Sequence, residues 1–196
     1  MRKETEEFDL NICVFCGSSD GLRPVYRQAA HDLGLALAKK ECGLVYGGAS
    51  VGLMGGVADA VLNAGGKAIG VIPKKLVDKE VAHKYLSELH VVDTMHERKA
   101  LMANLSDGFV AMPGGIGTLE ETFEIWTWMQ LGFHAKPLIL LNVDGFFDGL
   151  LSFLDDMTAE KFLKPVHRQM VAVTSDPASI PDLVANAKTV YQDKWI

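Results

Sequence analysis

Cysteine and histidine are scarce in this sequence, and their spacing outlines neither a disulfide framework nor a metal site. The 196 residues include three cysteines, of which only Cys13 and Cys16 are close together. This pair lies on a short apolar run with β character, where side chains three apart point to opposite faces. We therefore expect neither redox chemistry nor half of a zinc site. The six histidines show no H-E-x-x-H or comparable spacing, so the sequence gives no support for a metal.

Long apolar runs and an excess of positive charge are missing as well. No run approaches the ~18 apolar residues that cross a bilayer. Residues 1–9, which we expect to be flexible, are charged and lack the apolar core of a signal peptide. The formal net charge of −6 gives no broad attraction to nucleic acid or to an anionic membrane. We expect a cytoplasmic protein that binds neither, in which a phosphate ligand needs a local site.

Short apolar runs alternate with helical patterns along the whole chain. Strands are predicted at residues 11–15, 43–46, 67–72, 89–92, 108–112, 137–143 and 171–174. Helices are predicted at residues 25–40, 53–64, 97–105, 119–131, 146–160 and 180–191. Most strand candidates are continuously apolar, as in sheets covered on both faces. The alternation predicts an α/β protein with a doubly wound, Rossmann-like parallel sheet and helices on both faces. No linker divides it, so we expect residues 1–196 to form a single nucleotide-binding domain.

The strongest functional signal is the segment 113–118, Pro-Gly-Gly-Ile-Gly-Thr, which follows an apolar strand and opens a helix. In such sheets ligands bind beyond the carboxyl ends of the strands. Glycines there let backbone N–H groups approach an anion, and the helix N-terminus adds free donors and positive potential. A tight strand-to-helix turn is the alternative. Glu120 stands where the dinucleotide fingerprint requires a third glycine, so NAD binding is not predicted.

A second glycine-rich loop covers residues 47–52. It resembles the start of a P-loop, but Leu53 and Met54 replace the required lysine and hydroxyl residue, so ATP hydrolysis is not predicted. The glycines let the backbone pass close either to a ligand or to a neighbouring helix, and the pattern does not separate the two.

Two Thr-x-x-Glu patterns allow both a structural and a functional interpretation. Thr118 and Glu121 fit a capping box, in which the glutamate satisfies a free N–H at the helix start. A carboxylate near a helix N-terminus is also stabilised in its ionised form, which suits a base. Thr94 to Glu97 is a second candidate box, followed by Arg98 and Lys99. The helix dipole disfavours cations there, so these side chains indicate an anionic ligand or a carboxylate partner, with solvated surface charge as the alternative.

One helix end carries more apolar surface than a single face needs. Core packing is the simplest interpretation, and a dimer interface is the other. The residues concerned are Trp126, Trp128, Met129, Leu131 and Phe133.

Together these motifs resemble the LONELY GUY family of cytokinin riboside 5′-monophosphate phosphoribohydrolases, which were often mislabelled lysine decarboxylases. The family signature P-G-G-x-G-T-x-x-E is complete at residues 113–121, and M-H-E-R-K contains Arg98. The segment C-G-S-S at residues 16–19 and the loop 46–55 also match. The resemblance runs from about Ile12 to the end of the predicted strand 137–143.

The resemblance implies a hydrolase that cleaves the N-glycosidic bond of a purine nucleoside 5′-monophosphate, either AMP or an N6-prenylated AMP. It implies a homodimer without a cofactor, and it makes Arg98 and Glu121 the catalytic pair. Ile116 stands where many relatives carry tyrosine, which should matter little because the position contributes backbone. The substrate-binding residues implied are Ser18, Gly47, Gly48, Glu80, Lys99, Gly114, Gly115, Ile116, Gly117, Thr118, Leu119, Glu120 and Thr127.

The chemistry of this reaction suits the two catalytic candidates. Glycosidic cleavage passes through an oxocarbenium-like sugar, which a carboxylate such as Glu121 stabilises, and the same group can deprotonate the attacking water. Arg98 is a poor general acid because guanidinium groups stay protonated. It stabilises the ribose phosphate or the departing purine, or it positions Glu121. A non-catalytic nucleotide sensor on the same fold is the rival hypothesis, but a sensor would need only the phosphate loop.

Overall fold

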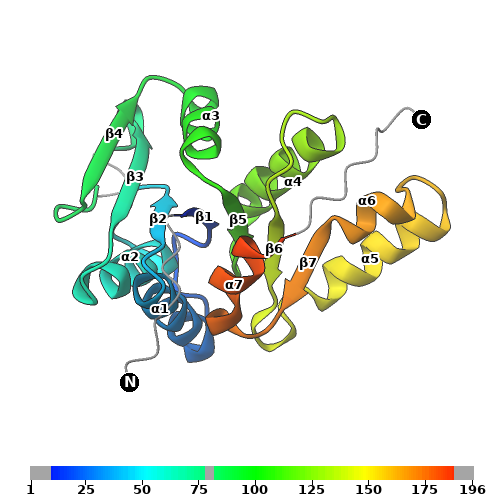
Figure 1. Cartoon of the computed structure of the whole chain (residues 1–196), viewed down its shortest axis with the longest axis horizontal. Helices are drawn as coiled ribbons and strands as arrows, with labels where there is room; N and C mark the ends of the chain where they lie inside the picture. Colours follow the sequence, from blue (N-terminus) through cyan, green and yellow to red (C-terminus); the bar gives the residue numbers. More distant parts are fainter. Residues whose placement is uncertain (1–9, 78–81, 188–196) are drawn as a thin grey trace.

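The centre of the molecule is a parallel β-sheet, seen in a computed structural model that describes residues 10–77 and 82–187. Seven strands, each parallel to its neighbours, follow the order β4-β3-β2-β1-β5-β6-β7 (Figure 1). Their bounds are β1 Asn11–Phe15, β2 Gly43–Tyr46, β3 Ala68–Pro73, β4 Glu88–Val92, β5 Gly108–Ala111, β6 Leu138–Leu141 and β7 Val171–Thr174.

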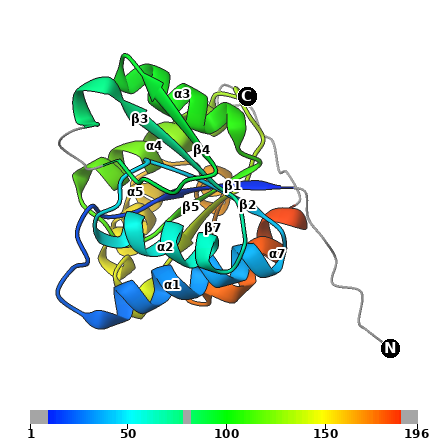
Figure 2. The same ribbon diagram turned by 90° about the vertical axis from the view of Figure 1, so that its left-hand side faces the viewer.

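Helices cover both faces of this sheet. Figure 2 views the sheet nearly edge-on, with α1, α2 and α7 on one side and α3 and α4 on the other. The bounds are α1 Pro24–Lys39, α2 Gly52–Asn63, α3 Met95–Leu105, α4 Ile116–Gln130, α5 Asp148–Ala159, α6 Pro165–Gln169 and α7 Ile180–Ala185. Three short 3₁₀ turns are η1 Lys74–Leu76, η2 Val143–Gly145 and η3 Pro177–Ser179. No helix among the described residues is long and apolar enough to span a membrane.

Alternate side chains of the central strands pack into two separate hydrophobic cores, one on each face of the sheet. On β1, Ile12 and Val14 pack with residues of α1, α2 and α7, whereas Cys13 and Phe15 pack with residues of α3 and α4. Both sides of the central strands are therefore removed from water, which explains why their sequences are continuously apolar rather than alternating. The cysteine pair divides as its spacing predicts, because Cys16 joins the core opposite to that of Cys13.

The doubly wound parallel sheet predicted from the sequence is confirmed, while several element bounds differ. The last helix was predicted at 180–191, but it ends at Ala185, where Asn186 is the C-cap and its side chain donates to the Asp182 carbonyl. Residues 188–191 lie outside the described part. The helix predicted from residue 119 begins at Ile116. Helix α6 was not predicted, because five residues are too few to show a helical period.

The strand order places a crevice between β1 and β5. The chain winds outward from β1 to β4 in one direction and from β5 to β7 in the other, so the order reverses between these two neighbours. Ligands of doubly wound sheets bind at this switch point, beyond the carboxyl ends of the strands. There the Gly17 N–H donates to the Pro113 carbonyl over 3.1 Å, which holds the loop after β1 against the loop after β5.

Candidate active site

The glycine-rich loop after β5 leads directly into α4, whose N-cap is Gly115. Within the described structure, no side chain caps this helix start. The first-turn N–H groups have no intrahelical acceptor by the geometry of any α-helix. The start of α4 therefore presents unsatisfied donors and the positive end of the helix dipole, which together suit an anion.

The glycines of this loop fall into two classes. A Cβ atom on Gly114 would lie 2.2 Å from Thr118 Oγ1 and 2.9 Å from Gly17 N, so packing within the protein demands a glycine there. A Cβ on Gly115 or Gly117 would meet no atom within 4 Å in the described structure. Unlike Gly114, these two glycines are not required by packing within the described structure. Their lack of a side chain leaves open space over the start of α4.

The capping-box interpretation of Glu121 is wrong. Because Gly115 is the N-cap, Thr118 occupies the third helical position and Glu121 lies in the second turn, beyond the reach of a cap. The sequence pattern misled because threonine is a favoured N-cap, whereas here a glycine takes that role. The second box is confirmed: the Glu97 N–H donates to Thr94 Oγ1 over 3.1 Å, and the Thr94 N–H donates back to Glu97 Oε2.

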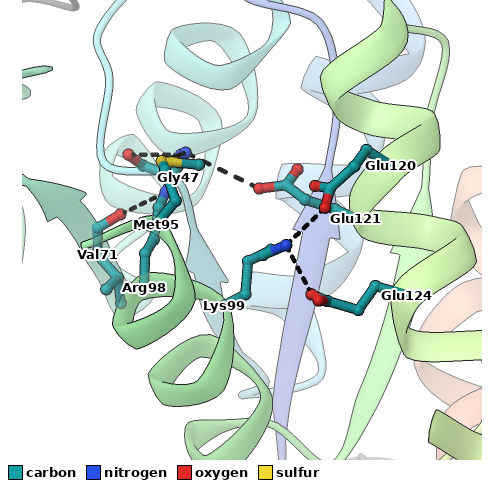
Figure 3. Close-up of polar contacts among 8 residues, drawn as sticks. All are labelled: Gly47, Val71, Met95, Arg98, Lys99, Glu120, Glu121 and Glu124. Atoms are coloured by element: carbon teal, nitrogen blue, oxygen red, sulfur yellow. Dashed lines mark hydrogen bonds and ion pairs between the residues drawn. The ribbon is translucent and has the colours of Figure 1, made fainter.

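Arg98 crosses the carboxyl ends of two strands. Its guanidinium is buried, with Nε donating to the Val71 carbonyl on β3 over 3.0 Å and Nη2 donating to the Gly47 carbonyl after β2 over 3.2 Å (Figure 3). The remaining nitrogen, Nη1, lies 3.9 Å from Glu121 Oε1 and 4.0 Å from the sulfur of Met95. Two protein bonds therefore fix the guanidinium while Nη1 faces Glu121.

Gly47 makes room for this arginine. A Cβ at this position would stand 2.1 Å from Arg98 Nη2. At Gly47, therefore, a glycine is needed because the Arg98 side chain of helix α3 passes close to the backbone. The sequence left open whether these glycines admit a ligand or a neighbouring helix, and at this position it is the helix. Gly48 has a positive φ of 79°, a backbone conformation that L side chains rarely adopt. Gly52 is pressed against Ser18 and Ser19, where a Cβ would lie within 2.5 Å of their backbones.

Arg98 and Glu121 are attracted as charges without a direct hydrogen bond, because 3.9 Å exceeds hydrogen-bonding distance. The Glu121 side chain is only 14% exposed. The pKa values of the Cys13 and Cys16 thiols lie well above the ordinary value. Burial is the larger cause, and the negative charge of Glu121 is the second. Protonated thiols are poor nucleophiles and poor metal ligands. Cys42 is also buried, which raises its pKa to about 11.

Lys99 points toward α4 rather than toward the glycine loop. Its ammonium lies 2.5 Å from Glu120 Oε1 and 3.0 Å from Glu124 Oε2, both on α4 (Figure 3). Burial of the ammonium lowers its pKa, but the hydrogen bonds and charges of the two carboxylates outweigh this effect, and the pKa lies above the ordinary lysine value. The two bases that oppose the dipole of α3 therefore both face carboxylates of α4, which was one of the predicted alternatives.

The remaining site candidates divide between the loop and the helix. Ser18 is exposed beside Gly52, and Ile116 is 83% exposed at the start of α4. Leu119 packs against the core instead. Thr127 is exposed, and its hydroxyl donates to the Phe123 carbonyl. It lies six residues after Glu121, which corresponds to about 9 Å along the helix axis. Glu80 lies outside the described residues.

A small cavity of about 200 Å³ adjoins the glycine loop. Two aromatic residues of its wall, Tyr26 of α1 and Phe146, were not predicted as site residues, because nothing in the sequence distinguishes such apolar positions from core. Two larger cavities of about 540 and 480 Å³ are lined, among the described residues, by other parts of the molecule, whereas a third of about 560 Å³ shares Asp20 and Gly21 with the small cavity. The wall of the small cavity consists of Ser19, Asp20, Gly21, Tyr26, Leu53, Pro113, Gly114, Gly115 and Phe146.

Comparison with known proteins places these features in a family context. Residues 54–184 match the family model described as "possible lysine decarboxylase". A probable cytokinin riboside 5′-monophosphate phosphoribohydrolase of Oryza sativa subsp. japonica, LOGL9, is 54% identical over 169 residues, covering 86% of this chain and 74% of that protein. The cytokinin riboside 5′-monophosphate phosphoribohydrolase LOG7 of Arabidopsis thaliana is 49% identical over 169 residues, covering 86% and 78%.

Solved structures show the same fold in proteins with different names. The molybdenum cofactor binding protein of Rippkaea orientalis has a TM-score of 0.69 and 25% identity, covering 91% of this chain and 96% of that one. The molybdenum cofactor carrier protein of Chlamydomonas reinhardtii, at 22% identity and a TM-score of 0.67, shows the fold alone; the match covers 91% of this chain and 100% of that one.

Proposed function

Because the chain belongs to the family of cytokinin riboside 5′-monophosphate phosphoribohydrolases, we propose that this enzyme hydrolyses the N-glycosidic bond of a purine nucleoside 5′-monophosphate. The products are the free base and ribose 5-phosphate. One observation carries the proposal for this chain: a buried, backbone-anchored Arg98 faces Glu121 beside an uncapped helix N-terminus. That family membership confirms the resemblance drawn from the sequence, whereas the individual site residues remain predictions.

The 5′-phosphate is proposed to bind over the start of α4. Gly115 and Gly117 leave their Cβ positions open in the described structure, and Gly115 caps the helix without a side chain. Backbone N–H groups at a helix N-terminus donate to phosphate oxygens, and these charge-assisted bonds are stronger than neutral ones. Because the chain has a net charge of −6, no general positive field replaces these local contacts. The phosphate then serves as the anchor that presents the sugar to the catalytic pair.

Glu121 is proposed to act on the anomeric carbon. Water adds its oxygen to C1′ of the ribose while the bond from C1′ to the base nitrogen breaks, and the proton that Glu121 takes from this water ends on the departing base, which regenerates the carboxylate. A carboxylate stabilises the positive charge that develops on the sugar, and it accepts the proton of the attacking water. Glu121 is only 14% exposed, so its charge acts in surroundings less polar than bulk water.

Arg98 is proposed to act as a fixed positive charge. Its Nε and Nη2 are engaged with backbone carbonyls, so only Nη1 is directed toward Glu121. This geometry suits each of the three roles considered: positioning Glu121, stabilising the ribose phosphate and stabilising the departing base. A proton-donating role is not favoured, because guanidinium groups stay protonated.

The finer features of the function follow from the same considerations. We propose a homodimer, because Phe133 and Leu131 at the end of α4 are exposed apolar residues, 73% and 37% respectively. We propose a cytoplasmic enzyme that acts without a cofactor and binds no nucleic acid, in line with the acidic net charge. All described strands join one sheet, which supports a single domain.

The test is an assay on the purified protein with AMP, isopentenyladenosine monophosphate and adenosine, each incubated separately. Chromatography should detect free base and ribose 5-phosphate in equal amounts from at least one nucleotide. Loss of two charge-assisted phosphate bonds of ~1.5–3 kcal/mol each predicts that kcat/KM for adenosine is lower by ~10² or more. Comparable values for AMP and adenosine would mean that the glycine loop is only a turn. Nucleotide binding without release of base would establish the rival hypothesis of a sensor.

A further inference from the structure

His83 lies buried between helix α2 and the loop that follows β2. Its side chain is only 6% exposed, and its ring Nε2 lies 3.0 Å from Asp59 Oδ1 on α2. Ring Nδ1 accepts a hydrogen bond of 3.2 Å from the Tyr85 N–H. Because a backbone N–H can only donate, the neutral ring carries its proton on Nε2, which donates to Asp59. The two neighbours therefore fix both the tautomer and the orientation of the ring.

The backbone at His83 is joined to the glycine-rich loop after β2. The His83 N–H donates to the Gly48 carbonyl over 2.9 Å. The preceding residue, Ala82, forms an isolated antiparallel bridge with Ala49. These contacts hold the peptide between Gly48 and Ala49. Since the ring of the same histidine is bonded to Asp59, the loop after β2 is tied to α2 through one residue.

The preceding peptide of this loop holds Arg98. The Gly47 carbonyl accepts from Arg98 Nη2 over 3.2 Å. Peptide units are planar, so only the two dihedral angles of Gly48 separate this peptide from the one that His83 holds. Gly48 has a φ of 79°, and a glycine changes its backbone conformation at little cost. A contact that fixes the Gly48 carbonyl therefore also restricts the direction in which the Gly47 carbonyl meets the guanidinium.

Loss of this restriction would let the guanidinium pivot. Nε would stay on the Val71 carbonyl, because Val71 belongs to β3, which is paired with a strand on each side. Nη1, which lies 3.9 Å from Glu121 Oε1, belongs to the part that would swing. A misplacement of about 1 Å is enough to lower the rate of a chemical step by ~10². The direction of Nη1 toward Glu121 therefore depends on the loop after β2.

We propose that His83 is a positioning residue, which together with Asp59 fixes the loop after β2 and so holds the Arg98 guanidinium in the direction that faces Glu121. The effect on turnover rests on the proposed function, whereas the effect on Arg98 itself is measurable without it. The 5′-phosphate is proposed to bind over the start of α4, so its capture should not depend on His83.

The first experiment measures the anchoring of Arg98 directly, by NMR on isotope-labelled protein. Comparison with Arg98→Met identifies the Arg98 side-chain signals. The Asp59 side chain is 57% exposed, so Asp59→Ala leaves no cavity in the core. We expect the Arg98 Nη2 protons to exchange with water ~10-fold faster in Asp59→Ala and in His83→Ala than in wild type. Asp59→Asn keeps an oxygen that accepts from His83 Nε2, and it should exchange as slowly as wild type.

A matched control is available on the surface of α1. Asp32→Ala also removes a carboxylate beside a histidine, because Asp32 Oδ1 lies 3.5 Å from His31 Nδ1. Both side chains of this pair are about half exposed, and neither contacts the loop after β2 in the described structure. Asp32→Ala should leave the exchange of the Arg98 protons and kcat unchanged.

The second experiment measures steady-state kinetics on the nucleotide that wild type cleaves. We expect kcat to fall by ~10–100-fold in His83→Ala and by ~3–10-fold in Asp59→Ala. KM and the inhibition constant of ribose 5-phosphate should change by less than about threefold, and Asp59→Asn should keep most of kcat. Adding Asp59→Ala to Arg98→Met should cause no further loss of kcat, because both changes act through one guanidinium. Thermal unfolding verifies that each variant is folded, and Asp59→Ala is decisive if His83→Ala is not.

Three results would overturn the proposal. Unchanged exchange of the Arg98 protons in Asp59→Ala would show that the loop holds the guanidinium without this contact. A lower thermal midpoint with kcat within about twofold of wild type would show that the histidine only stabilises the fold. A further loss of kcat on adding Asp59→Ala to Arg98→Met would show that the effect bypasses Arg98. If wild type releases no base from any nucleotide, the proposed function itself fails; that outcome is separate, because proton exchange still tests the anchoring.

Discussion

Substitution of Gly115 by valine tests the phosphate site without disturbing the fold. The backbone at Gly115 has φ −94° and ψ −159°, an extended conformation that a β-branched residue adopts readily. A Cβ there would meet nothing within 4 Å of the described structure. The cost of replacing glycine with valine at an N-cap is about 1 kcal/mol, so the variant should remain folded.

The same substitution should be severe for turnover. The valine methyl groups would fill the space above the start of α4 in which we place the phosphate. Two charge-assisted hydrogen bonds of ~1.5–3 kcal/mol each would be lost, which corresponds to a fall in kcat/KM of ~10²–10⁴. The assay follows free base released from the nucleotide that wild type cleaves, and thermal unfolding monitors the fold.

Two other glycines provide matched controls. Gly149→Val introduces the same side chain in α5, where a Cβ also meets nothing within 4 Å in the described structure, and it should leave kcat/KM unchanged. Gly114→Ala should instead lower stability, because its Cβ would clash with Thr118 Oγ1. The reasoning is refuted if Gly115→Val keeps kcat/KM within about threefold of wild type, because no phosphate could then occupy that space.

Other substitutions separate chemistry from stability. Glu121→Gln should lower kcat by ~10²–10³ while the thermal midpoint changes little, because Glu121 does not cap its helix; a large loss of stability with normal turnover would contradict this. Arg98→Met should destabilise the fold by about 3–5 kcal/mol in urea titration, because two buried carbonyls lose a charged hydrogen-bond donor and Glu121 loses a neighbouring positive charge; a change below about 1 kcal/mol would be inconsistent with the contacts described. Burial lowers the pKa of His134, so the unfolded chain binds its proton more readily and stability should fall as the pH drops below ~6.5; His134→Gln should weaken that decline in urea titrations between about pH 7 and 5. Light scattering at micromolar concentration should show a dimer, and a mass of 21.3 kDa would count against it.

Those parts of the fold that depend on local pattern were predictable from the sequence. Strand β1 has the predicted bounds, because its buried residues 12–15 read as a continuous apolar run with β character. Helix α4 was placed correctly but begins three residues earlier than predicted. Its N-cap is Gly115, whereas the sequence pattern offered Thr118 as the N-cap of a helix beginning at residue 119.

Parts of the site that depend on distant contacts were not predictable in this way. The bonds from Arg98 to Val71 and Gly47 join residues 27 and 51 positions apart. No periodicity of the sequence reports such a contact. The two bases of α3 were flagged because they oppose the helix dipole, but their carboxylate partners on α4 emerged only from the fold.

The anchoring of Arg98 also bears on the entropy of substrate binding. A free arginine side chain has rotamer freedom corresponding to about 2 kcal/mol, which is lost when its head group is held. Here the backbone carbonyls of Val71 and Gly47 hold the guanidinium once the chain has folded. The entropy cost of ordering the Arg98 side chain is therefore part of the free energy of folding and is not subtracted from the affinity for the nucleotide. A cation held only by attraction to Glu121 would have to be ordered again by every substrate molecule.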